Sequence, residues 1–172
     1  GFYKTYIKSK DKPYTNAFWD RYFSGEISDT VTINPSIDDL STKYHYNSVE
    51  NIILRHFHNN NLKLKGKVVL DIGSGAGHWI DFYRSCHVKT ILGIDISENI
   101  INFLKKKYGE YLKRSVFLTN GKAHFILDHL GQDYDIVNAI GVMFHIVNDK
   151  EWEETVLKVG NVVKENGVFI IG

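Results

Sequence analysis

The sequence predicts an α/β fold in which a doubly wound, mostly parallel sheet carries helices on both faces. Short runs of β-branched residues and leucine, typical of strands buried on both faces, alternate with segments of helical apolar spacing. One run, residues 68–71, opens directly into a glycine-rich loop, and two runs end in an acid, Asp71 and Asp95. Ligands of such sheets bind at the carboxyl ends of the strands, so these acids mark the expected site.

The predicted elements follow in a regular order. Ser48 is a plausible N-cap for a helix that precedes the first strand. The predicted strands are residues 68–71, 90–95, about 115–119, a fourth from 134 with a trailing segment to 146, and 167–172. Further helices are expected from His78, after Ser97 as a cap, and over about 150–163. Because the fifth strand would be an unpaired edge, we expect the last strands of the sheet to be missing from this chain.

Residues 1–46 have no sustained period but many aromatic side chains. Tyr14, Phe18 and Tyr22 are spaced to share one helical face, with Trp19 beside them. Such a stripe either packs in the core or forms a lid, in which aromatic faces contact a cation and exclude water. We therefore divide the chain into an N-terminal extension or lid, residues 1–46, and a core domain, residues 47–172. In the lid interpretation Tyr14 and Trp19 contact the cofactor.

The loop after the first strand predicts the cofactor. Gly73, Gly75 and Gly77, with Ser74 among them, let the backbone turn sharply and approach a ligand closely. A dinucleotide fingerprint would require glycine or alanine where this chain has His78, and it would place a pyrophosphate beside Asp71. S-adenosylmethionine (SAM) carries cationic ammonium and sulfonium groups, so the same acid becomes attractive, directly or through a water.

Asp95 is the candidate for ribose recognition. A carboxylate at the end of the second strand can accept hydrogen bonds from both ribose hydroxyls, a role shared by NAD and SAM sites. Ile96 follows it and is included in the cofactor site. The alternative is that Asp95 caps a helix or lies in a solvated turn.

In this order, the motifs resemble class I SAM-dependent methyltransferases, particularly the group that acts on small metabolites. The resemblance covers about residues 62–172 and rests on the loop at 69–77, Asp95, the segment at 134–146 and the strand at 167–172. It implies a Rossmann-like core, SAM as cofactor, and methyl transfer to an oxygen or nitrogen of a small-molecule acceptor. It also places Ile140, after the fourth strand, in the cofactor site.

The chain departs from this family after the third strand. The family usually has an acid there that accepts the adenine amino group, whereas this chain has Lys122, which cannot accept a hydrogen bond. Either Asn120 supplies a carbonyl oxygen and Ala123 a backbone amide, or adenine recognition is weakened. Lys122 could equally be a solvated loop residue.

His145 is the candidate general base. It follows the fourth strand, at the edge that faces the sulfonium in this fold, and histidine has a pKa suited to neutral pH. The alternative is a histidine that packs against or caps the next helix. Residues 138–141 lack the prolines typical of DNA amine methyltransferases, and Cys86 falls in the first helix after the loop rather than at a nucleophile position.

Composition limits the remaining function classes. The chain has 172 residues, 43% of them hydrophobic, and a formal net charge of +1, so one core is expected and nucleic acid is an unlikely partner. We find no metal-ligand spacing, apolar membrane span or signal peptide, so we expect no metal and a cytoplasmic protein. A catalytically inactive SAM-binding module and, less favoured, an NAD-type oxidoreductase remain alternatives. The sequence does not indicate the oligomeric state or the acceptor.

Overall fold

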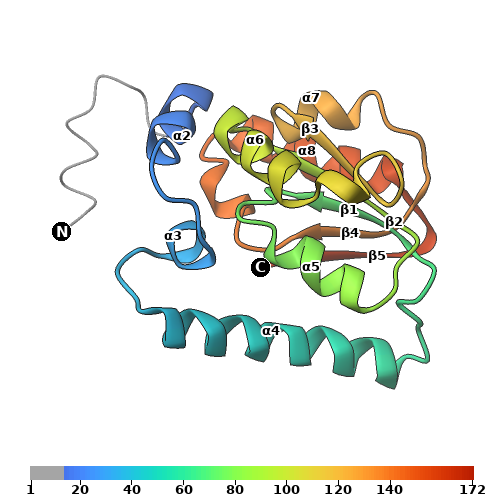
Figure 1. The fold of residues 1–172 in the computed structure, drawn as a ribbon. Coiled ribbons are helices and arrows are strands. Elements are labelled where there is room, and N and C mark those ends of the chain that lie inside the picture. The colour runs from blue at the N-terminus through green and yellow to red at the C-terminus, as the bar shows by residue number, and fades with distance from the viewer. Residues whose placement is uncertain (1–13) are drawn as a thin grey trace.

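The structure is a computed structural model that describes residues 14–172 of the chain. Its centre is a five-stranded sheet (Figure 1). The strands are β1 (Val68–Ile72), β2 (Thr90–Asp95), β3 (Val116–Asn120), β4 (Tyr134–Ala139) and β5 (Val163–Ile171). All neighbouring strands run parallel, in the order β3-β2-β1-β4-β5. The predicted fold class is confirmed.

Helices cover both faces of the sheet. They are α2 (Asn16–Tyr22), α3 (Asp29–Ile33), α4 (Asp39–Asn59), α5 (His78–Ser85), α6 (Glu98–Lys107), α7 (Ala123–Leu127) and α8 (Asp149–Val162), with 3-10 turns η1 (Gly109–Tyr111) and η2 (Met143–His145). Figure 1 shows α4 and α5 on the opposite side of the sheet from α7 and α8.

Two hydrophobic cores hold these layers together. Apolar side chains of α4, α5 and α6, such as Ile53, Trp79 and Leu104, pack on one face of the sheet. Leu127 of α7 and Val159 of α8 pack on the other face. Burial on both faces explains why the strands are apolar along their whole length rather than in alternation.

The connections create a crevice at the end of β1. The chain leaves β1 for β2 on one side, and β4 joins β1 on the other side. In parallel sheets a ligand binds where the strand order reverses in this way, beyond the carboxyl ends of the strands. The glycine-rich loop follows β1 at this point.

The N-terminal helices differ from the predictions in two places. Helix α4 begins at Asp39 rather than at Ser48, because the Asp38 carboxylate accepts a hydrogen bond from the Ser41 N–H at 2.7 Å and caps the helix there. The predicted division at residue 46 therefore falls inside α4. Tyr14 precedes α2 with a φ of 64°, so it does not share the helical face of the later aromatics. Residues 1–13 of the predicted extension lie outside the described residues.

Strand β5 begins at Val163 rather than at Gly167, because the end of α8 passes directly into the sheet. Val163 pairs with Tyr134, and the register shifts before Ile136 pairs with Val168. The irregularity is therefore confined to the start of the strand, away from the carboxyl edge.

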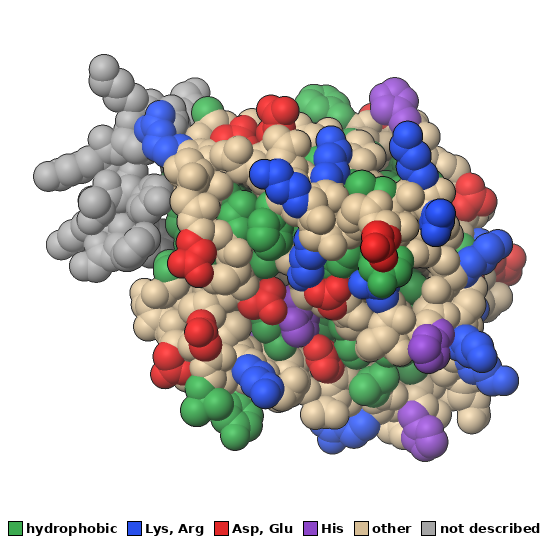
Figure 2. All heavy atoms as spheres, in the orientation of Figure 1, with side chains coloured by type: hydrophobic (Ala, Val, Ile, Leu, Met, Phe, Trp, Pro, Cys, Tyr) green, Lys and Arg blue, Asp and Glu red, His purple; other side chains and the backbone are tan. Residues whose placement is uncertain are grey.

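The surface carries both signs of charge. Figure 2 shows acidic and basic side chains interspersed on one face, with apolar side chains between them. Among residues 14–172, no helix has both the length and the apolar composition that a membrane span requires.

Candidate active site

The carboxyl ends of the central strands border a cavity of about 780 Å³. Cavities of this size hold small-molecule ligands and cofactors. The predicted cofactor residues that line it are Tyr14, Trp19, Gly73, Ser74, Gly75, Asp95, Ile96, Lys122, Ala123 and Ile140. The predicted base His145 also lines the cavity, whereas Asp71, Gly77 and Asn120 do not.

Gly73 and Gly75 form the cavity wall at the end of β1. Both have a positive φ, 75° and 50° respectively. A Cβ atom on Gly73 would lie 2.5 Å from the Val142 side chain, and one on Gly75 would lie 3.3 Å from Thr32. Glycine is therefore required at Gly73 by space as well as by conformation.

Gly77 packs closely against the end of α6 and the residue that follows it. Its φ is 90°, and a Cβ atom there would lie 2.5 Å from the Tyr108 hydroxyl, which donates a hydrogen bond to the Gly77 carbonyl at 2.9 Å. Lys107, the last residue of α6, donates a hydrogen bond to the Ala76 carbonyl at 2.9 Å. Gly77 thus faces α6, and its contacts hold the loop from behind rather than forming the ligand wall.

Asp71 is fully buried beneath the loop. Its Oδ1 accepts a hydrogen bond from Asn138 Nδ2 at 2.7 Å, whereas its Oδ2 has no partner among the described residues. Burial raises the pKa of Asp71 to about 6, against the lowering effect of Asn138. The carboxylate therefore lies behind the lining, and its incompletely compensated charge suits a cationic ligand.

Asp95 lies at the cavity wall and is only 7% exposed. Its oxygens accept hydrogen bonds from the Gly75 N–H at 3.0 Å and the Ser97 N–H at 2.9 Å. Each oxygen keeps a second lone pair for a ligand hydroxyl. Burial, with smaller contributions from the charges of Asp71 and Asp20, raises the pKa of Asp95 to about 6. Asp95 also has the alternative, structural role, because its carboxylate holds the backbone at both Gly75 and Ser97.

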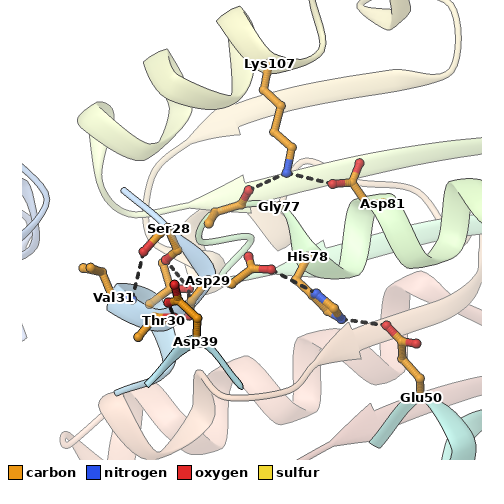
Figure 3. A network of polar contacts seen from close by, with 12 residues as sticks. Ser28, Asp29, Thr30, Val31, Asp39, Glu50, Gly77, His78, Asp81 and Lys107 are labelled. Carbon is orange, nitrogen blue, oxygen red and sulfur yellow. Dashed lines mark hydrogen bonds and ion pairs between the residues drawn. The ribbon is translucent and has the colours of Figure 1, made fainter. Parts of the chain in front are cut away.

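His78 joins the loop to the N-terminal helices (Figure 3). Its Nδ1 lies 3.3 Å from Asp29 of α3, and its Nε2 lies 2.8 Å from Glu50 of α4. The ring stacks on Tyr46, with centroids 3.4 Å apart. As predicted, His78 begins helix α5, and its side chain also attaches α3 and α4 to the site.

Asn120 is not among the residues that line the cavity, and its contact with adenine stays a prediction. Its Nδ2 donates to the carbonyls of Asp95 and Ile96, each at 3.0 Å, so the side chain joins the ends of β2 and β3. Ala123 does line the cavity, as the first residue of α7. The first N–H groups of a helix lack an intrahelical partner, so this amide can donate to a ligand.

Lys122 is only partly exposed and forms an ion pair. Its Nζ contacts both carboxylate oxygens of Glu151 at 3.0 Å, and both residues line the cavity. The nearly buried His124 lies 4.0 Å from the same carboxylate. Glu151 belongs to the first turn of α8, and no local sequence signal indicated that it would reach this loop.

Helix α2 covers the site from the N-terminal side. Asp20 Oδ1 accepts a hydrogen bond from the Ser97 hydroxyl at 2.7 Å, and the Asp20 carbonyl accepts one from Asn99 at 2.7 Å. Trp19 lies edge-on to His145, with centroids 4.8 Å apart. No residue of α2 is buried. The helix is therefore attached mainly through polar contacts and ring packing at the cavity.

His145 sits in an aromatic environment. Tyr14 and Phe144 lie 5.4 and 4.2 Å from its ring, centroid to centroid. Burial lowers the pKa of His145 to about 4, so the imidazole is neutral at pH 7. Its Nδ1 is buried and has no hydrogen-bond partner among residues 14–172.

Together these features define a nucleoside-binding α/β protein of the class I methyltransferase type. The sequence of residues 70–169 matches a family described as methyltransferase domain, and the chain belongs to this family. The predicted resemblance is confirmed, and SAM is the cofactor that the family uses. Comparison with curated protein sequences gave no significant match.

Solved structures share the fold. Phosphoethanolamine N-methyltransferase 1 from Haemonchus contortus, solved with phosphoethanolamine and S-adenosylhomocysteine, matches with a TM-score of 0.69 and 20% identity, over 90% of this chain and 30% of its own. The YcgJ protein from Bacillus subtilis matches with a TM-score of 0.58 and 22% identity, over 74% of this chain and 50% of its own. A SAM-dependent methyltransferase from Mesorhizobium loti matches with a TM-score of 0.51 and 18% identity, over 63% of this chain and 47% of its own. The chain spans half or less of each of these proteins.

We predict that Gly77→Ala lowers the free energy of unfolding by about 2 to 4 kcal/mol, because the new Cβ atom is strained at this φ and meets Tyr108. Urea unfolding followed by circular dichroism measures the change. Gly160→Ala is the control, since nothing lies within 4 Å of that position and alanine favours helix α8. If Gly77→Ala is as stable as the parent but no longer binds S-adenosylhomocysteine, the result would show that Gly77 contacts the ligand instead.

Proposed function

We propose that this chain is the SAM-binding part of a methyltransferase that methylates an oxygen or nitrogen of a small-molecule acceptor. The observation that carries the proposal is one cavity in which the glycine loop, Asp95 and His145 all take part. Its volume suits a cofactor together with a small acceptor. The acceptor class has separate support in the Haemonchus neighbour, which was solved with the small molecule phosphoethanolamine.

The residues present fit SAM. Asp71 supplies uncompensated negative charge near the end of β1, and Gly73 and Gly75 keep the wall free of side chains. The spare lone pairs of Asp95 would accept the ribose hydroxyls. When bound, SAM supplies an electrophilic methyl group, which moves from sulfur to the acceptor atom. Most of the catalysis assigned to the protein is then alignment and exclusion of water.

His145 is the proposed general base. Its neutral ring can take a proton from an acceptor hydroxyl or ammonium, and His145 lines the cavity. The surrounding rings of Tyr14 and Trp19 keep water away. The low pKa makes His145 a weak base, so it suits an acceptor whose proton is lost as the methyl group arrives.

The described lining favours an acceptor without a phosphate. Lys122 is the only lysine or arginine among the described residues of the cavity wall, and Glu151 already neutralises it. Val49, Ile52 and Ile171 add apolar surface. We therefore expect an acceptor with an apolar body and one nucleophilic oxygen or nitrogen.

The first test is calorimetric titration with SAM, S-adenosylhomocysteine and NADH, followed by an acceptor screen. We expect both sulfur nucleosides to bind and NADH not to bind, because Asp71 repels a pyrophosphate. Asp71 and Asp95 must be ionised to attract a cation and accept hydroxyl protons, and their raised pKa values near 6 mean that acid protonates them. Affinity should thus fall below pH 6, by up to about tenfold per pH unit for each of the two acids. Constant affinity between pH 7.5 and 5 would contradict this role for the two acids.

We expect His145→Ala to reduce turnover by about 10² to 10⁴-fold while SAM affinity stays nearly constant. The measurement is single-turnover methyl transfer to an acceptor found in the screen, with the exposed His129→Ala as control. Unchanged turnover would contradict the role of His145 as a base and would mean that the protein promotes methyl transfer by positioning alone. A catalytically inactive SAM-binding module would bind the cofactor but turn over no acceptor at all.

Helix α2 should behave as a lid. Because it buries no residue, its amides should exchange rapidly in the free protein and slow down when S-adenosylhomocysteine binds. Hydrogen exchange measured over residues 14–22 tests this, with β1 as an internal reference that is protected in both states. Strong and equal protection of α2 with and without ligand would make it part of the core instead.

A further inference from the structure

The pair formed by Lys122 and Glu151 lies where the sequence lacks an expected acid. Both residues line the cavity, and the lysine ammonium contacts both carboxylate oxygens at 3.0 Å. The side chains are about one-third exposed, 32% and 34% respectively. A carboxylate is therefore present at the loop after β3, although it comes from α8.

The strand register defines which part of a nucleoside would reach this pair. Asp95 at the end of β2 is directly paired with Asn120 at the end of β3. A ribose held by Asp95 therefore has the loop at residues 121–123 as its next neighbour along the sheet edge. Ile96 and Val142 add apolar surface to the cavity, as a planar base requires.

Glu151 is suited to accept a hydrogen bond from such a base. A carboxylate has about four acceptor positions, and the two contacts with Lys122 leave the others open. The backbone of Glu151 is fixed as well, because its N–H donates to the Asn148 side chain at 3.0 Å. An exocyclic amine would donate to this carboxylate, whereas a carbonyl at the same ring position has no proton to donate and would lose that hydrogen bond.

We propose that Glu151, positioned by Lys122, accepts a hydrogen bond from the exocyclic amine of adenine and thereby selects adenine over a 6-oxo base. This inference rests on the proposed function, since it requires that a SAM-type nucleoside occupies the cavity. The carboxylate from α8 takes the part of the acid that the chain lacks at position 122.

The test is calorimetric binding of two probes, S-adenosylhomocysteine and its 6-oxo analogue S-inosylhomocysteine. The parent should prefer the adenine compound by about tenfold or more, the scale for one hydrogen bond to a charged group. Glu151→Gln should abolish this preference, because an amide can also donate to the 6-oxo group. Glu153→Gln, an exposed position on the same helix, should keep it. Melting temperatures report whether each variant is folded.

A second variant tests the placement. Adding Lys122→Asp to Glu151→Gln puts a carboxylate directly on the loop, and the preference for the adenine compound should return. Retention of the parent preference in Glu151→Gln, or no recovery in the double variant, would overturn the assignment of Glu151. If the parent binds neither probe, the proposed function itself fails.

Discussion

One buried carboxylate constrains the whole site. Asp71 lies in the central strand, fully buried, and Asn138 satisfies only one of its oxygens among the described residues. Removing a carboxylate from water is costly unless it is paired and hydrogen-bonded, and its raised pKa reflects that cost. A cationic ligand above the loop would relieve the imbalance, whereas an anionic one would increase it. The choice of ligand charge is therefore built into the sheet itself, independently of the side chains that touch the ligand.

The same charge affects its surroundings. Asp71 and Asp20 both raise the pKa of Asp95, so two acids from other parts of the chain act on this residue of the cavity wall. Asp20 lies on α2, so this helix brings negative charge as well as aromatic side chains to the site. If α2 moves as proposed, a bound cation would favour its docked position, and by reciprocity the docked helix would favour the cation.

Sequence reasoning succeeded where the signal is local. The strands, the helix start at His78 and the cap at Ser97 depend on neighbouring residues, so pattern and spacing were sufficient to predict them. The start of α4 was missed because Ser48 and Asp38 are both acceptable caps, and tertiary packing decides between them.

The site contacts that the sequence did not indicate have a common cause. Gly77 carries the same motif signal as Gly75, yet Tyr108, far along the chain, determines that it faces α6. Glu151 is one of several acids on its helix, and only its distance to Lys122 distinguishes it. The attachment of His78 to separate helices also carries no local pattern. A single sequence reveals which residues can do chemistry, whereas their partners depend on long-range packing.

The attachment of His78 also shapes how this protein can diversify. Asp29 and Glu50 bind opposite nitrogens of its ring and come from separate helices, so the loss of either still leaves the imidazole one carboxylate partner. Losing both would leave a mostly buried imidazole without a carboxylate partner at the cofactor loop. Under the proposed function, substitutions at Val49 and Ile52, which line the cavity from α4, would change the acceptor that fits. Such changes would reshape this apolar part of the cavity while the residues that hold His78 stay the same.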